Sequence, residues 1–130
     1  MRLDTTAFSS GVSVVGGSAI SFANAGIYDV QFSAQMRKDS ASSAQLDIWL
    51  RLVRGGSTVD VPDSNTSVLL GTTRKFVAAW DFMVAVEAGD QYQLMWSADD
   101  PTMVLLYQPP QTGPARPATP SLIVSVVQAG

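Results

Sequence analysis

The chain has 130 residues, of which 46% are hydrophobic and only 15% charged, and it contains neither cysteine nor histidine. Its length fits one domain with a single core, and its apolar composition excludes a disordered chain. A formal net charge of -3 and basic residues that are scattered along the chain argue against a nucleic-acid partner, and the missing cysteines exclude disulfides and thiolate metal sites.

The first part of the chain reads as three strands. Two short ones are predicted at Val12–Val15 and Ile20–Phe22, and a long one at Gly26–Lys38. In the long strand every second residue from 28 to 36 is apolar, and the residues between them are polar. A period of two places one set of side chains against a core and the other in water or against a partner.

The same reading continues to the end of the chain, and no segment has the period of a helix. Further strands are predicted at Leu46–Val53, Val59–Pro62, Ser67–Leu70, Arg74–Val86, Tyr92–Trp96, Met103–Tyr107 and Leu122–Val127. Val59–Pro62 is expected at a sheet edge because Pro62 cannot donate to a ladder. The proline-rich segment Gln108–Pro120 is expected to be an extended loop. About ten strands without helices predict an all-β, antiparallel jelly-roll sandwich.

Several of these strands are apolar on both faces. In an antiparallel protein without helices only one face of a sheet can meet the core, so the other face requires cover from another subunit. The alternative, in which these strands are shorter and end in loops, stays open. The predicted subunit interface consists of Val77, Ala79, Met83, Leu105, Tyr107, Ile123 and Val127.

The residue types needed for familiar catalysis are missing. Without histidine and cysteine there is no Ser-His-Asp triad, no histidine-based zinc site and no thiol nucleophile. Lys38 and Lys75 each stand next to an arginine at a strand end, which favours solvated cations over a buried Ser-Lys pair. We therefore expect a protein that is not an enzyme.

Paired carboxylates on turns are the only candidate metal ligands. Asp99 and Asp100 are weak candidates for calcium, since hard cations prefer carboxylate oxygens on loops, and Asp60 and Asp63 form a similar pair. The competing interpretation is that each aspartate bonds its own backbone in a turn. No EF-hand spacing supports calcium, so no metal or cofactor is expected.

Tryptophan side chains can stack on sugar rings, so each tryptophan is a candidate contact for a sugar. Trp80 and Trp96 fall on predicted core faces, which indicates packing. Trp49 falls on the polar face of its strand, beside Asp47 and Arg51, and is predicted to be a surface contact. A subunit interface is the alternative for this residue.

The order of four segments resembles the jelly roll shared by complement component one-q heads and tumour-necrosis-factor ligands. The segments are GIYDVQFSAQ from Gly26, LDIWLRLVRGGSTVDVPDSNT from Leu46, FVAAWDFMVAVEAGDQYQLMWSADD from Phe76 and TPSLIVSVVQ from Thr119. Gly26, Tyr28 and Phe32 fill the first strand motif of that family, and Gly89-Asp90 opens the third. The sequence of these segments is most similar to the bacteriophage branch of the family, in which short motifs such as FSAQ, IWLR and PSLIV recur in virion proteins.

The resemblance implies a jelly roll of ten strands that forms compact homotrimers around a threefold axis. We expect a virion structural protein, and first a capsid decoration (cement) protein that binds the major capsid protein or another virion protein. A short N-terminal arm, Met1–Ser10, precedes the jelly-roll domain at 11–130 and is expected to grip the shell. The predicted capsid contacts are Arg2, Leu3, Asp4 and Phe8.

Two other functions stay open. The first alternative is the receptor-binding head of a tail spike or head fibre, which would adhere to a host surface or glycan and would normally follow a shaft. The second is a secreted complement-like or lectin-like ligand. The N-terminus lacks the apolar core of a signal peptide and no apolar run approaches a membrane span, so we expect a protein made in the host cytoplasm, with no membrane partner.

Overall fold

The computed structural model describes residues 12–15, 18–39, 42–71, 74–106, 110–116 and 122–129. These residues form strands and no helix, so no helix among them could span a membrane. The strands are β1 (Val12–Val15), β2 (Ala19–Phe22), β3 (Gly26–Arg37), β4 (Ala44–Arg54), β5 (Ser57–Asp60), β6 (Thr66–Leu70), β7 (Lys75–Val86), β8 (Gln91–Ala98), β9 (Val104–Leu105), β10 (Gln111–Thr112), β11 (Ala115–Arg116) and β12 (Leu122–Gln128). The predicted arm Met1–Ser10, with its four capsid contacts, lies outside the described residues.

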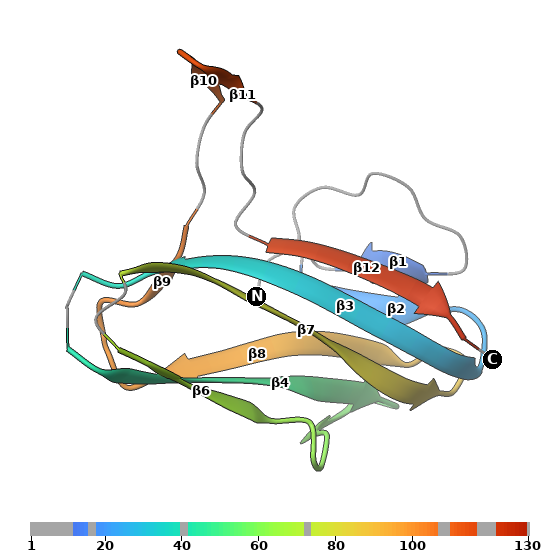
Figure 1. Cartoon of the computed structure of the whole chain (residues 1–130). Coiled ribbons are helices and arrows are strands. Elements are labelled where there is room, and N and C mark those ends of the chain that lie inside the picture. The colour runs from blue at the N-terminus through green and yellow to red at the C-terminus, as the bar shows by residue number, and fades with distance from the viewer. Residues whose placement is uncertain are drawn as a thin grey trace.

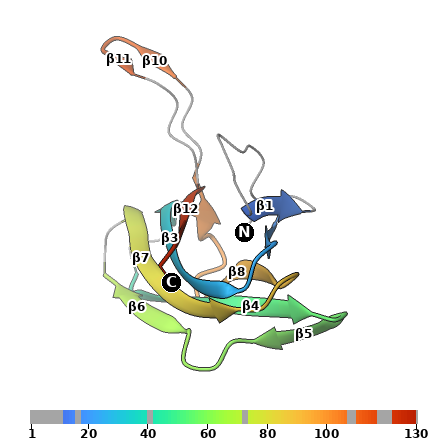
Figure 2. The same ribbon diagram turned by 90° about the vertical axis from the view of Figure 1, so that its right-hand side faces the viewer.

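Two antiparallel sheets lie one above the other (Figure 1). The larger sheet has the order β1-β2-β8-β4-β5, with β6 also paired to β4, and the smaller has the order β12-β3-β7, with β9 also paired to β3. The end view shows β7 at one border of the smaller sheet, above β6 of the larger one (Figure 2). The predicted all-β, jelly-roll-like sandwich is confirmed.

Alternation along the central strands builds the core between the sheets. The even-numbered side chains of β3 from Tyr28 to Met36 are all buried. Leu46, Ile48 and Leu50 of β4 face them from the larger sheet and are at most 1% exposed. Burial of one such aliphatic side chain stabilises a fold by roughly 1.5–3 kcal/mol, so these two strands dominate the core.

Two edge-to-face aromatic pairs contribute to this core. The ring of Phe22 meets that of Tyr28 edge to face, with centroids 4.7 Å apart. Phe32 contacts Trp80 edge to face at 4.8 Å. Such pairs contribute about 0.5–1.5 kcal/mol beyond the burial of their area.

Residues 110–116, the described part of the segment predicted to be an extended loop, Gln108–Pro120, contain two short strands. They form the hairpin β10–β11, with Gln111 opposite Arg116 and Thr112 opposite Ala115. Gly113 and Pro114 supply the turn, and a Gly-Pro pair is a turn signal that is present in the sequence. The hairpin stands clear of both sheets (Figure 1).

Candidate interaction surfaces

The smaller sheet turns one face to the core and the other to solvent, and we call the solvent side the outer face. Strand alternation and register assign to it Ile27, Asp29, Gln31, Ser33, Gln35 and Arg37 of β3, Lys75, Val77, Ala79, Asp81, Met83 and Ala85 of β7, and Ile123, Ser125 and Val127 of β12. The central strand contributes mostly polar side chains to this face. The two flanking strands contribute most of its apolar ones.

Large apolar side chains are exposed on the outer face. Val77 is 55% exposed, Met83 59%, Ile123 52% and Val127 61%, and Ala79 is exposed beside them. These five residues belong to the predicted subunit interface, and they come from strands that are far apart in sequence. Apolar side chains gathered on one face in this way are typical of interaction surfaces.

The prediction for Leu105 is wrong. Leu105 pairs with the buried Met36 and packs against the core, whereas its neighbour Val104 pairs with Arg37 and is exposed. The register of the short strand β9 on β3 decides which of its two residues faces outward, and this register is a long-range property. Tyr107, the remaining predicted interface residue, lies outside the described residues.

Charges on the outer face are grouped by sign. Arg37 and Lys75 lie directly opposite one another at one end of the β3–β7 pair. Toward the other end Asp29 lies opposite Met83, and Asp81 lies opposite Gln31 one row away. A hydrogen bond to Asp29, followed by repulsion from its charge, raises the pKa of Asp81. Gln31 donates from Nε2 to Asp29 Oδ2 at 3.1 Å, while Asp29 Oδ1 is buried without a hydrogen-bond partner.

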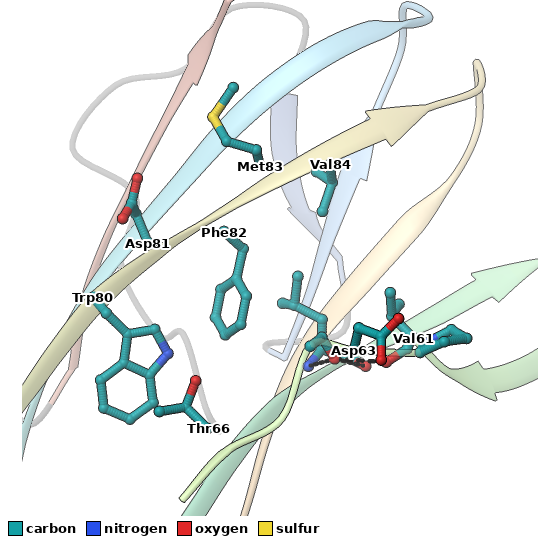
Figure 3. Close-up of a pocket in the computed structure, with 11 residues that line it drawn as sticks. Val61, Asp63, Thr66, Trp80, Asp81, Phe82, Met83 and Val84 are labelled. Carbon is teal, nitrogen blue, oxygen red and sulfur yellow. Dashed lines mark hydrogen bonds between the residues drawn. The ribbon is translucent and has the colours of Figure 1, made fainter. Parts of the chain in front are cut away.

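A hollow of about 300 Å³ lies between β7 and the loop that joins β5 to β6. Trp80 and Phe82 point into it from β7, whereas Asp81 and Met83 point to the opposite side of that strand (Figure 3). The indole Nε1 of Trp80 is buried and has no hydrogen-bond partner. Its lining combines the apolar side chains of Leu50, Val61 and Val84 with the polar ones of Asp63, Ser64 and Thr66.

Serine in this hollow is a structural residue. The Ser64 hydroxyl donates to the carbonyl of Val61 at 2.7 Å and accepts the backbone N–H of Leu50 at 3.1 Å. The bond from Leu50 holds the β5–β6 loop against β4, and the bond to Val61 lies within that loop. Asp63, next to it, adopts a left-handed backbone with φ of 61°, a conformation that aspartate tolerates better than most residues.

Trp49 lies half-buried on the solvent side of the larger sheet. Its Nε1 donates to Asp60 Oδ1 at 2.9 Å, and Arg51 Nε donates to the same oxygen at 3.1 Å. These two bonds lower the pKa of Asp60, and the bond from the indole has the larger effect. A shallow hollow of about 660 Å³ beside them is lined also by Asp47 and Asn65. Trp49 as a surface contact stays a prediction.

Asp47 in this second hollow is held by neighbouring polar groups. It accepts hydrogen bonds from the Ser67 hydroxyl, from Asn65 Nδ2 at 3.2 Å and from Gln45 Nε2 at 3.3 Å. The bond from Ser67 is the largest cause that lowers the pKa of Asp47. The hollow therefore presents an ionised carboxylate beside an indole ring at neutral pH.

The two weak calcium candidates are engaged by the protein's own groups. Asp99 Oδ1 accepts the backbone N–H of Gln45 at 2.8 Å. Asp100 Oδ1 accepts both the hydroxyl and the backbone N–H of Thr102, at 2.7 and 2.9 Å, and these bonds lower its pKa. The bonds of Asp100 fit the turn interpretation, whereas Asp99 binds the backbone of the distant strand β4. Within the described ranges no group of three or more potential ligands could hold a metal.

Lys38 is buried, and the expectation of a solvated cation is wrong. The residue is 0% exposed, and its Nζ donates to the carbonyls of Ser42 at 2.5 Å and Gly71 at 2.6 Å. Lys38 continues the even-numbered, inward-facing series of β3, and this parity was the signal that could have identified it. Its two acceptors come from separate loops, so the ammonium joins those loops at one end of the sandwich.

Comparison with known proteins adds no assignment: no protein-family model and no curated protein sequence matches this chain.

Proposed function

We propose that this protein is a homotrimeric structural protein of a phage virion, a capsid decoration protein that binds and stabilises the head shell. The observation that carries self-association is the outer face, where Val77, Met83, Ile123 and Val127 are each more than half exposed. The threefold symmetry and the virion role are supported by the resemblance of the four sequence segments to the phage branch of the jelly-roll family.

The engagement of the described polar side chains supports a role in binding. Ser64, Lys38 and Asp90 are buried and form hydrogen bonds that hold loops and turns in place. Each of these groups already has a structural task. The protein then acts through the shape and chemistry of its surfaces, with the major capsid protein or another virion protein as its partner.

A second candidate function is the receptor-binding head of a tail spike or head fibre. The observation that favours it is the hollow beside Trp49, where an indole ring stands next to Asp47, Asp60 and Asn65. An aromatic surface with polar groups at its border is the arrangement that binds sugar rings and their hydroxyls.

Localisation on the virion separates the two candidates. Antibody labelling over the whole head shell is expected for a decoration protein, whereas labelling at tail or fibre tips would support the receptor-binding head. Loss of the gene is expected to lower the resistance of the capsid to heat or pressure. A normal shell with reduced host attachment would contradict the decoration role.

A further inference from the structure

We infer that the outer face binds a second copy of this chain through unlike charged ends, with Asp29 and Asp81 of one copy against Arg37 and Lys75 of the next. The inference rests on the proposed self-association and adds which groups meet. It follows from three observations: a pair of cations, a pair of carboxylates, and apolar rows that separate them on the same face.

The cationic end is a pair of like charges. The backbone N–H of Lys38 donates to the carbonyl of Arg74 at 2.8 Å, which makes that pair hydrogen-bonded. Pair types alternate along an antiparallel ladder, so Arg37 and Lys75 form a non-hydrogen-bonded pair, in which side chains lie closer. Like charges in such cross-strand positions destabilise a sheet. The contact of Arg37 with Asp39, at 3.7 Å between exposed side chains, offsets little of this repulsion.

The acidic end is a pair of like charges of the opposite sign. The Asp81 carboxyl meets that of Asp29, and a hydrogen bond to Asp29, followed by repulsion from its charge, raises the pKa of Asp81. Within the described part of the chain no arginine or lysine forms an ion pair with either carboxylate. Among the described strand residues of the outer face these four are the charged ones, because β9 and β12 contribute none; Asp39, which contacts Arg37, lies just beyond the end of β3.

Further copies of the chain can provide a group of opposite charge for the cationic end and for the acidic end. The two ends are eight residues apart on β3, roughly 27 Å along the strand. In a ring of three, the rows between them, with Val77, Ala79 and Ile123, would face the axis. Each acidic end would then meet the cationic end of the next copy, which is the heterologous contact that closes a ring. Every like-charge pair would gain a partner of the opposite sign.

Charge reversal tests this assignment. Lys75→Glu and Asp81→Lys are each expected to weaken self-association of the full chain at least about tenfold, measured by sedimentation at neutral pH. The double variant K75E/D81K is expected to regain most of the affinity because unlike ends meet again at every contact. An equimolar mixture of the two single variants is expected to regain only part of it, since a ring of three leaves one contact between two copies of the same variant. Arg74→Glu is the matched control, since it makes the same change in charge one residue before β7 and is expected to have a small effect.

Salt gives an independent readout. Raising the salt concentration from about 0.05 to 0.5 M is expected to weaken association of the wild-type chain, because exposed ion pairs are screened. Unchanged β-sheet circular dichroism would verify that the variants are folded. If K75E and D81K associate as R74E does, or if the double variant K75E/D81K does not recover, the charge assignment is overturned while self-association stands. If the wild-type chain stays single at all concentrations, the proposed function fails with it.

Discussion

The guanidinium of Arg54 donates two hydrogen bonds to the carboxylate of Asp90, from Nε to Oδ1 at 2.7 Å and from Nη2 to Oδ2 at 2.6 Å. Asp90 is 1% exposed, and its Oδ2 also accepts the backbone N–H of Glu87 at 2.9 Å. The pair joins the end of β4 to the turn between β7 and β8. Because Val53 pairs with Gln91, Arg54 and Asp90 continue the register of β4 and β8, and the bond to Glu87 holds the β7–β8 turn at this end of the larger sheet.

Replacing Asp90 is expected to cost stability. Asp90→Ala removes two charge-assisted bonds and leaves the N–H of Glu87 without its acceptor, so the free energy of unfolding should fall by about 2–3 kcal/mol. Urea unfolding at fixed protein concentration measures the change. Glu87→Gln is the control: its bridge to Arg54 is exposed, and a loss as large as that of D90A would contradict this account.

The same carboxylate makes stability depend on pH. The Arg54 bonds hold the pKa of Asp90 below its usual value, so its contribution is fully present above about pH 4 and is lost as pH falls through the folded-state pKa. The difference in unfolding free energy between wild type and Asp90→Asn is expected to shrink between pH 7 and pH 3. A difference that stays constant over this range would show that the bonds do not depend on the charge of Asp90.

Burial of Lys38 predicts an unusual sensitivity at a charged position. Lys38→Met keeps the length of the side chain but leaves the carbonyls of Ser42 and Gly71 without their donor, at a cost of about 2–3 kcal/mol. Arg74→Met, at an exposed position outside the proposed contact, should stay within about 0.5 kcal/mol of wild type. Equal effects of the two substitutions in thermal or urea unfolding would contradict the buried placement.

Two leucines with opposite exposure test the position of the core. Leu46 is 0% exposed and Leu69 is 77% exposed. Leu46→Ala is expected to destabilise the fold by about 2–5 kcal/mol, because it removes buried apolar groups and leaves a cavity. Leu69→Ala is expected to change stability by less than about 0.5 kcal/mol. The reverse order in urea unfolding would place the core on the other side of the larger sheet.

Elements with a strong local period could be predicted from the sequence. The alternation of β3 specified its inward residues from Tyr28 to Met36, and that of β7 specified those from Phe76 to Val86. The outward placement of Val77 and Met83 followed from the same parity. A two-residue period is a property of the local chain, so no knowledge of partners was needed.

Features that depend on distant segments could not be predicted in this way. Leu105 faces the core because of the register of β9 on β3, and two residues carry no period of their own. The acid pair needs the diagonal contact of Asp29 and Asp81, which are 52 positions apart in the chain and meet only when β3 pairs with β7. Lys38 was expected in solvent because lysine is rarely buried, although its even number continues the inward-facing series of β3.

The mass of the assembly in solution tests self-association through the outer face most directly. Light scattering on the purified full chain is expected to give three times the 13.8 kDa of one chain. The double variant Met83→Gln/Val127→Thr is expected to shift the mass toward a single chain, while Leu69→Gln on the larger sheet leaves it unchanged. A wild-type mass near 13.8 kDa at all concentrations, or a trimer that M83Q/V127T does not weaken, would contradict the account.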